Sequence, residues 1–103
     1  MAKGKFKFGM VISGVVYTEF EMREATTEDM LEAEMEAARV GGGAHTPILF
    51  NGMMILRQLV SVAAGDKRFE GPFTPNMLKA LKPADYRALR DVMGRLDELG
   101  EAE

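Results

Sequence analysis

Cysteine is absent from this 103-residue chain, and so is tryptophan. Without cysteine the chain has no disulfide framework, no thiolate zinc site and no cysteine nucleophile. The lack of thiols fits a reducing compartment, so we expect the protein in the cytoplasm. Residues 1–5 are basic, but alternating residues follow them instead of the apolar run of a signal peptide or a membrane span. We therefore expect a soluble protein that does not contact a membrane.

Residues that carry catalysis or bind metals are scarce. The single histidine, His45, lies in a glycine-rich loop with no serine, aspartate or second histidine at a motif spacing. Glu28, Glu32 and Glu36 repeat every four residues, but no partner histidine or aspartate cluster accompanies them. The glycine triplet at residues 41–43 lacks the lysine and hydroxyl residue of a phosphate loop. We predict no catalytic, metal or cofactor-binding residue, and a protein that is not an enzyme.

An excess of positive charge is also missing. The formal net charge is -3, and the basic residues are scattered along the chain instead of clustered. Phosphate binding normally needs lysine and arginine on one face. The last two helical segments are spaced like a helix-turn-helix, but the second carries acids where a recognition helix would meet phosphate: Asp85, Asp91, Asp97 and Glu98. We therefore expect no nucleic-acid partner.

The amino-acid composition is that of an ordinary globular protein. Hydrophobic residues make up 47% and charged residues 28% of the chain. A chain of this length forms one core, so we expect a single domain over residues 1–103. Nine methionines are the unusual feature. Methionine is flexible and polarizable, so it fills cores or lets an apolar surface adapt to its partners.

The first part of the chain alternates with the period of a strand. Phe6, Phe8 and Met10 fall on one side, and Ser13-Gly14 is a two-residue turn signal before a second run of strand-forming residues. This pattern predicts an antiparallel β-hairpin over residues 5–22.

A first helix is predicted over residues 27–39. Thr26 and Thr27 are capping residues, acids follow them, and the glycines at 41–43 end the helix. Glu28, Glu32 and Glu36 would lie on a solvated face. We expect the core-facing stripe to consist of Leu31, Met35 and Ala38, with Met30, Ala33 and Ala37 beside it.

A second helix, the longest, is predicted over residues 47–64. Thr46-Pro47 is a cap followed by the proline favoured at the first helical position, and Gly65 would end the helix. Its narrow polar arc holds Asn51, Arg57, Gln58 and Ser61. Phe50 and Met54 would project into that arc, and the neighbouring Met53 would widen an apolar patch. We expect a partner-binding surface there, unless the hairpin or the last helix covers it. The three candidate residues are Phe50, Met53 and Met54.

A short helical turn over residues 75–81 and a last helix over residues 83–99 complete the chain. Gly100 would end the last helix and leave a frayed acidic tail at 100–103. We expect about half of the residues to be helical. In the predicted core, three residues of the long helix meet three of the last one: Leu56, Leu59 and Val60 against Leu89, Val92 and Leu96. The order of elements gives an α+β fold, a hairpin followed by three main helices and a short helical turn.

Several stretches, in this order, resemble the tail assembly chaperones of Mu-like and P2-like contractile-tail phages and prophages. They are residues 20–34, 49–51, 57–60, 71–74 and 77–89, with a short break at Lys82, where a capping serine is typical of the family. The set extends over most of the chain, and its order, more than any single stretch, gives it specificity.

The resemblance implies a non-catalytic chaperone that binds and solubilises the tape measure protein while the tail tube polymerises. It implies no cofactor. It further implies the tail tube protein, a longer form of the chain made by ribosomal frameshifting, or a second copy of the chain as further partners. The location it implies is the cytoplasm of the bacterial host, with the protein absent from the mature virion.

Two other functions remain open from the sequence. A small structural or adaptor component would stay in the finished particle through a self-complementary interface. An acidic regulator of the antitoxin kind would instead need a toxin as its partner. An enzyme is the least favoured class.

Overall fold

The computed structural model describes residues 1–43 and 46–102. In chain order these form the elements β1 (Ala2–Ile12), β2 (Val15–Met22), α1 (Thr27–Val40), α2 (Pro47–Gln58), β3 (Leu59–Ala64), β4 (Lys67–Phe69), α3 (Pro75–Lys79) and α4 (Pro83–Ala102). Helices hold about half of the chain, and the class is α+β, both as predicted. His45, for which we expected no catalytic role, and Glu103 at the end of the predicted tail lie outside the described residues.

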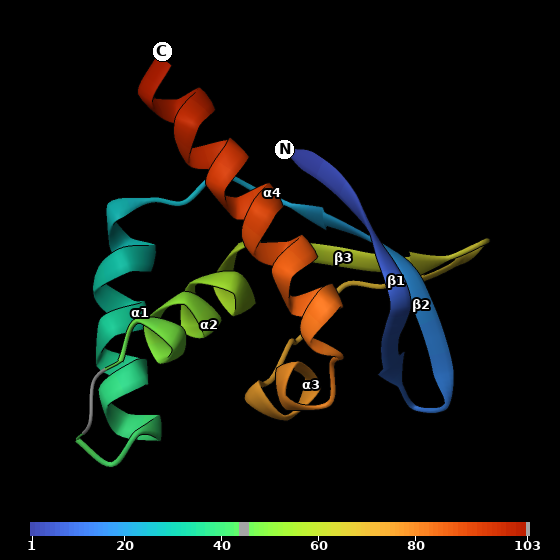
Figure 1. Cartoon of the computed structure of the whole chain (residues 1–103), viewed down its shortest axis with the longest axis horizontal. Coiled ribbons are helices and arrows are strands. Elements are labelled where there is room, and N and C mark those ends of the chain that lie inside the picture. The colour runs from blue at the N-terminus through green and yellow to red at the C-terminus, as the bar shows by residue number, and fades with distance from the viewer. Residues whose placement is uncertain (44–45, 103) are drawn as a thin grey trace.

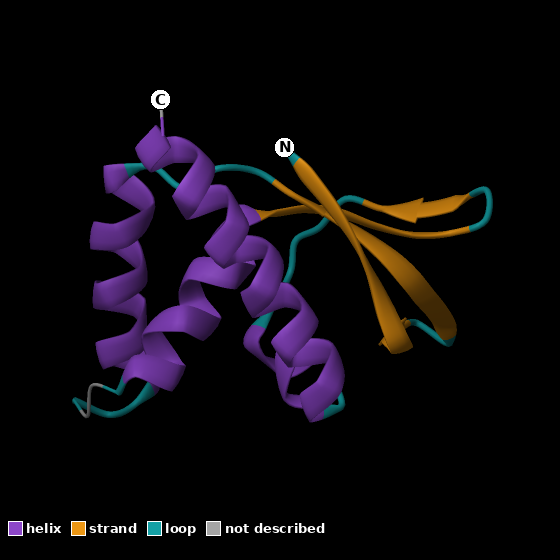
Figure 2. Cartoon of the chain, turned by 45° about the horizontal axis from the view of Figure 1, so that its top comes forward, coloured by secondary structure: helices purple, strands orange, loops and turns teal. Residues whose placement is uncertain are grey.

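The strands form one antiparallel sheet in the order β1-β2-β3-β4. After β2 the chain leaves the sheet, forms α1 and α2, and returns as β3 beside β2 (Figure 1). The helices gather to one side of the strands, and α4 runs next to β1 (Figures 1 and 2). One face of the sheet therefore meets the helices across a shared core.

The predicted hairpin is confirmed. Ser13 and Gly14 both have positive φ, 51° and 79°, which is the geometry of the two-residue turns that match strand twist. Pairing between β1 and β2 is interrupted between Lys5 and Met10, where β1 bulges. Gly9 lies in the bulge with φ of 106°, and a Cβ there would lie 2.5 Å from Cγ1 of Val16. A side chain at Gly9 would therefore strain the bulge.

The helix predicted over residues 47–64 ends at Gln58 in the structure, so the prediction is wrong for residues 59–64. Residues 59–64 form β3, where Phe20 of β2 pairs with Val62. Val60 and Val62 are β-branched and fit a strand better than a helix, and β3 supplies the partner that the second edge of β2 needs. Gly65 makes the turn into β4 instead of ending a helix. A continuous apolar run does not by itself distinguish a helix from a buried strand, which explains the error.

The other helix boundaries agree closely with the sequence pattern. Thr26 caps α1 with a reciprocal capping box to Asp29, and the Thr46 hydroxyl accepts a hydrogen bond from the Leu49 N–H of α2. The short helix α3 begins at Pro75 as predicted but ends at Lys79, two residues before the predicted end, and α4 begins at Pro83 as predicted. The end of α4 is not as predicted, because the helix passes Gly100 and continues to Ala102.

The core lies between the sheet and the helices. Leu89, Val92 and Leu96 of α4 are buried as predicted, whereas Leu59 reaches the core from β3, and Leu56 and Val60 are only half-buried. The sheet and the remaining helices contribute mainly Phe6, Met10, Phe20, Met22, Val62, Ala33, Ala37, Met53, Met54 and Ile55.

Candidate protein-binding surface

The three candidate residues on α2 do not form an outer patch. Met53 and Met54 are 5% and 6% exposed, and Phe50 is half-buried against the core. The expectation that they project into a solvated polar arc is wrong, because Gln58 and Ser61 of that arc are themselves buried. Helices α1, α3 and α4 all contact α2, so little of its surface meets solvent.

Met53 nevertheless borders an apolar surface groove with a volume of about 200 Å³. Ile48, at the start of α2, lines this groove and is 71% exposed. The hydroxyl of Tyr86 in α4 donates to the Ile48 carbonyl oxygen at 3.3 Å, and burial raises the pKa of this phenol. The remaining lining residues come from α1, α2 and α3 and are Val40, Leu49, Gly52, Pro75, Leu78 and Lys79.

Gly52 lies in the wall of this groove. A Cβ at Gly52 would lie 3.7 Å from Cδ1 of Leu78 and 3.8 Å from the Tyr86 hydroxyl, at ordinary contact distance. A methyl group at this position would therefore fit beside Leu78 and Tyr86 without displacing them.

A buried ionic cluster sets the position of α1. Asp29, 2% exposed, accepts two hydrogen bonds from the Arg23 guanidinium at 2.7 and 2.9 Å, and one from Nε of Arg57 at 2.9 Å. The N–H of Thr26 donates to the same carboxylate at 2.8 Å. The Arg23 guanidinium, more than any other partner, holds the pKa of Asp29 far below its usual range. The cluster joins the end of β2, the start of α1 and the end of α2.

Gln58 reinforces the same junction. Its backbone carbonyl accepts from the N–H of Arg23 at 2.9 Å, and its side-chain amide donates to the Arg23 carbonyl at 3.0 Å. The Arg23 guanidinium also donates to the carbonyl of Arg57 at 2.8 Å. This junction fixes how α1 is rotated about its own axis.

The face of α1 that packs against the core is opposite to the one predicted from the sequence. Asp29, Ala33 and Ala37, four residues apart, share the buried face. Leu31 and Met35 lie on the opposite side and are 60% and 68% exposed. The expectation that Leu31, Met35 and Ala38 face the core is wrong, because small alanines let α1 approach α2 closely and the buried carboxylate must face its arginines.

A second buried carboxylate anchors α4 to the sheet. Asp85, fully buried in the first turn of α4, accepts from three consecutive N–H groups of the β1 bulge, those of Lys7, Phe8 and Gly9. The distances are 2.6, 3.1 and 2.9 Å. These N–H groups lie where β1 loses its register with β2, so Asp85 satisfies donors that the sheet leaves unpaired.

The sequence pattern did not identify Asp29 or Asp85 as structural couplers. Both lie in stretches that carry the family resemblance, as do Arg23, Arg57 and Gln58. The available signal was an aspartate three residues after a capping threonine, which indicates a capping box. The contact of Asp29 with Arg57, 28 positions away in the chain, has no local signature.

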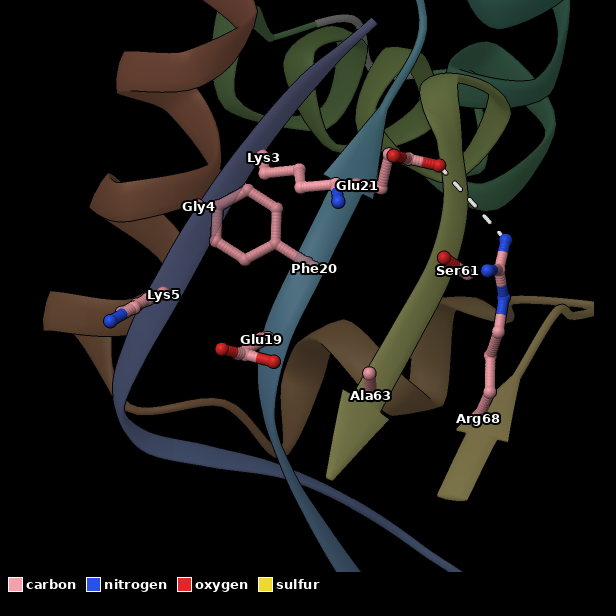
Figure 3. A pocket seen from close by; sticks show the side chains of 9 residues that line it. All are labelled: Lys3, Gly4, Lys5, Glu19, Phe20, Glu21, Ser61, Ala63 and Arg68. Carbon is pink, nitrogen blue, oxygen red and sulfur yellow. Dashed lines mark ion pairs between the residues drawn. The ribbon is translucent and has the colours of Figure 1, made fainter. Parts of the chain in front are cut away.

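A shallow pocket on the sheet is lined by charges of both signs (Figure 3). Lys3 and Lys5 of β1 stand opposite Glu21 and Glu19 of β2 in the strand register, and Arg68 lies 4.0 Å from Glu21. The ring of Phe20 lies against Gly4, where a Cβ would approach Cζ of Phe20 to 2.3 Å (Figure 3). The alternating charges lack the single sign of a phosphate-binding surface.

Two structural findings bear on the function classes considered from the sequence. Across residues 1–43 and 46–102, no three histidine, aspartate or glutamate side chains stand close enough to hold a metal ion. Over the same described ranges, no helix combines the length and apolar content that crossing a bilayer requires.

Comparison with known proteins gives a match to a family model. The family model described as "Tail assembly protein gp41" matches residues 6–103. No curated protein and no solved structure matches the chain. The match extends from within β1 to the end of the chain and so includes both buried carboxylates and the groove. It confirms the resemblance to the tail assembly proteins of Mu-like phages. The chain belongs to the tail assembly protein gp41 family and acts in phage tail assembly.

Proposed function

We propose that this protein is a tail assembly chaperone that binds the tape measure protein and keeps it from aggregating before the tail tube encloses it. The observation that carries the proposal is the apolar groove at Ile48, open to solvent on a protein whose family acts in tail assembly. An exposed apolar groove on a small protein is typical of a protein-binding site.

The groove suits an apolar helical segment. Ile48, Leu49 and Leu78 offer aliphatic contacts, and Met53 adds a side chain that adapts to different shapes. A long client exposes many different apolar stretches, so its holder needs tolerance more than close complementarity. Of the three residues expected from the sequence, Met53 would contact the client. Phe50 and Met54 would act by packing that holds α2 in place.

The test is co-purification of the tape measure protein with Ile48→Glu. The substitution places a charge at an exposed rim position, so the fold should remain, while apolar contact with the client is lost. We expect the recovered client to fall by about tenfold or more. The matched control is Val11→Glu, at an exposed aliphatic residue of β1 outside the groove. Unchanged recovery with Ile48→Glu, or equal loss with both variants, would reject the groove as the client site.

Mass spectrometry of purified particles separates this role from that of a structural component. A chaperone leaves the tail once the tube is complete, so we expect few copies or none. A constant stoichiometry with the tail tube protein would show a structural component instead.

A further inference from the structure

Helix α1 presents its largest apolar side chains to solvent. Leu31 and Met35 lie one turn apart on the face opposite Asp29, Ala33 and Ala37, and Met30 beside them is half exposed. Single exposed apolar residues are common on protein surfaces. Here, however, the helix buries Ala33 and Ala37 and exposes its leucine and methionines, and the ionic cluster at Asp29 fixes that rotation.

Acidic side chains border this apolar stripe on both sides. At about 100° per residue, Glu28 and Glu32 fall on one side of Leu31 and Met35, and Glu34 falls on the other. All three glutamates are exposed. Arg39 is the one basic residue of α1, and it forms an ion pair with Glu36. The outward face is therefore an apolar stripe between two acidic margins.

We propose that this face of α1 binds a basic amphipathic helix of another protein. Leucine or similar residues of that helix would cover Leu31 and Met35, while its lysines or arginines would meet Glu28, Glu32 and Glu34. The negative charges of the three glutamates favour a basic partner over an acidic one. A second copy of α1 would bring glutamates against glutamates, and an anionic membrane would be repelled in the same way.

The surface is separate from the groove at Ile48. Leu31 and Met35 point away from α2, which together with α3 supplies most of the groove, and neither residue lines it. Helix α1 lies at the opposite end of the molecule from the hairpin turn (Figure 1). The inference goes beyond the chaperone proposal, since it concerns the chemistry of a partner helix at another site. It holds whichever tail protein supplies that helix.

The probe is a synthetic amphipathic peptide of about 18 residues, with leucines on one face and lysines elsewhere. A matched peptide carries glutamate at every lysine position. Fluorescence anisotropy with the whole protein should show the lysine peptide binding about tenfold or more tightly than the glutamate peptide, with an affinity that falls as salt rises. Equal affinity for the two peptides would overturn the proposal.

Two variants locate the site. Leu31→Ser with Met35→Ser should lower the affinity for the lysine peptide about tenfold or more. Val11→Ser with Val16→Ser, an exposed apolar pair on the hairpin, should leave it unchanged. The opposite pattern, or equal losses, would reject α1 as the site. If the first double variant does not fold, Glu28→Lys with Glu32→Lys should instead reverse the preference toward the glutamate peptide, and an unchanged preference would be equally decisive against the proposal.

Discussion

The carboxylate of Asp29 joins three elements of the fold, the end of β2, the start of α1 and the end of α2. Asp29→Asn keeps the shape but removes the charge that two arginines face. We expect a loss of about 2 to 3 kcal/mol in the free energy of unfolding, below the 3 to 5 kcal/mol typical of a broken, fully buried pair. The smaller figure reflects Arg23 and Arg57, whose side chains remain 38% and 37% exposed. Urea denaturation measures the change.

Glu36→Gln is the matched control on the same helix. Glu36 pairs with Arg39 at the surface, where solvent screens the interaction, so the change in the free energy of unfolding should be too small to resolve. A loss as large as that of Asp29→Asn would show that helix charge, and not the buried cluster, accounts for the effect.

The lowered pKa of Asp29 predicts how the free energy of unfolding depends on pH in the acid range. Because the arginines lower the pKa of Asp29 in the folded state, its contribution is fully present above its unfolded pKa of about 4 and is lost progressively as pH falls below that value. Between about pH 5 and pH 2, the stability of Asp29→Asn should therefore fall less steeply than that of the unchanged protein. Parallel curves would contradict this prediction.

Asp85 makes a different prediction, because its partners are backbone N–H groups. Asp85→Ala removes the acceptor of the N–H groups of Lys7, Phe8 and Gly9 and leaves them unpaired beside α4. Amide hydrogen exchange at these three residues should accelerate by about tenfold or more, with about 2 kcal/mol lost from the unfolding free energy. Asp91→Ala, at an exposed position of α4, is the control and should leave their exchange unchanged.

Helix α4 contains a helix-destabilising glycine that its packing does not require. Gly94 lies in the helix interior, and a Cβ there would meet no atom within 4 Å. Gly94→Ala should therefore raise the free energy of unfolding by about 0.5 to 1 kcal/mol. Gly4→Ala is the contrasting variant, since its Cβ would collide with the Phe20 ring and should destabilise the sheet. Thermal unfolding of both variants should show shifts of opposite sign.

The elements show which parts of the fold were accessible from sequence. The hairpin, the caps and the start of each helix follow from local chemistry at Ser13, Gly14 and the threonines before α1, α2 and α3. The change from helix to strand at Gln58 was not accessible, because residues 59–64 are apolar throughout and their strand depends on pairing with β2.

The rotation of α1 was missed for a related reason. By hydrophobicity alone, Leu31 and Met35 are better core residues than Ala33 and Ala37, so the stripe was expected to face inward. The observed rotation depends on Arg57, 28 positions from Asp29 in the chain, which no local pattern reveals. The exposure predicted for the candidate residues of α2 was wrong as well. Met54 is buried and Phe50 is half-buried against the core, whereas exposed apolar side chains lie at Ile48, on α1, and on the hairpin at Phe8, Val11 and Val16.

At the scale of the whole molecule, the helices provide the surfaces suited to binding. The groove at Ile48 and the outward face of α1 both belong to the helical part, whereas the pocket on the sheet carries charges of both signs. The buried carboxylates hold the helices to the strands, so each surface is presented by a fixed scaffold. Such preorganisation lowers the cost of binding a flexible client.

The soluble fraction of the tape measure protein, produced with and without this chain and measured after centrifugation, tests the central claim most directly. The account predicts that the client is mostly insoluble alone, becomes soluble with the unchanged chain and with Val11→Glu, and returns to the pellet with Ile48→Glu. A tape measure protein equally soluble without the chain, or one that stays insoluble in its presence, would contradict the account.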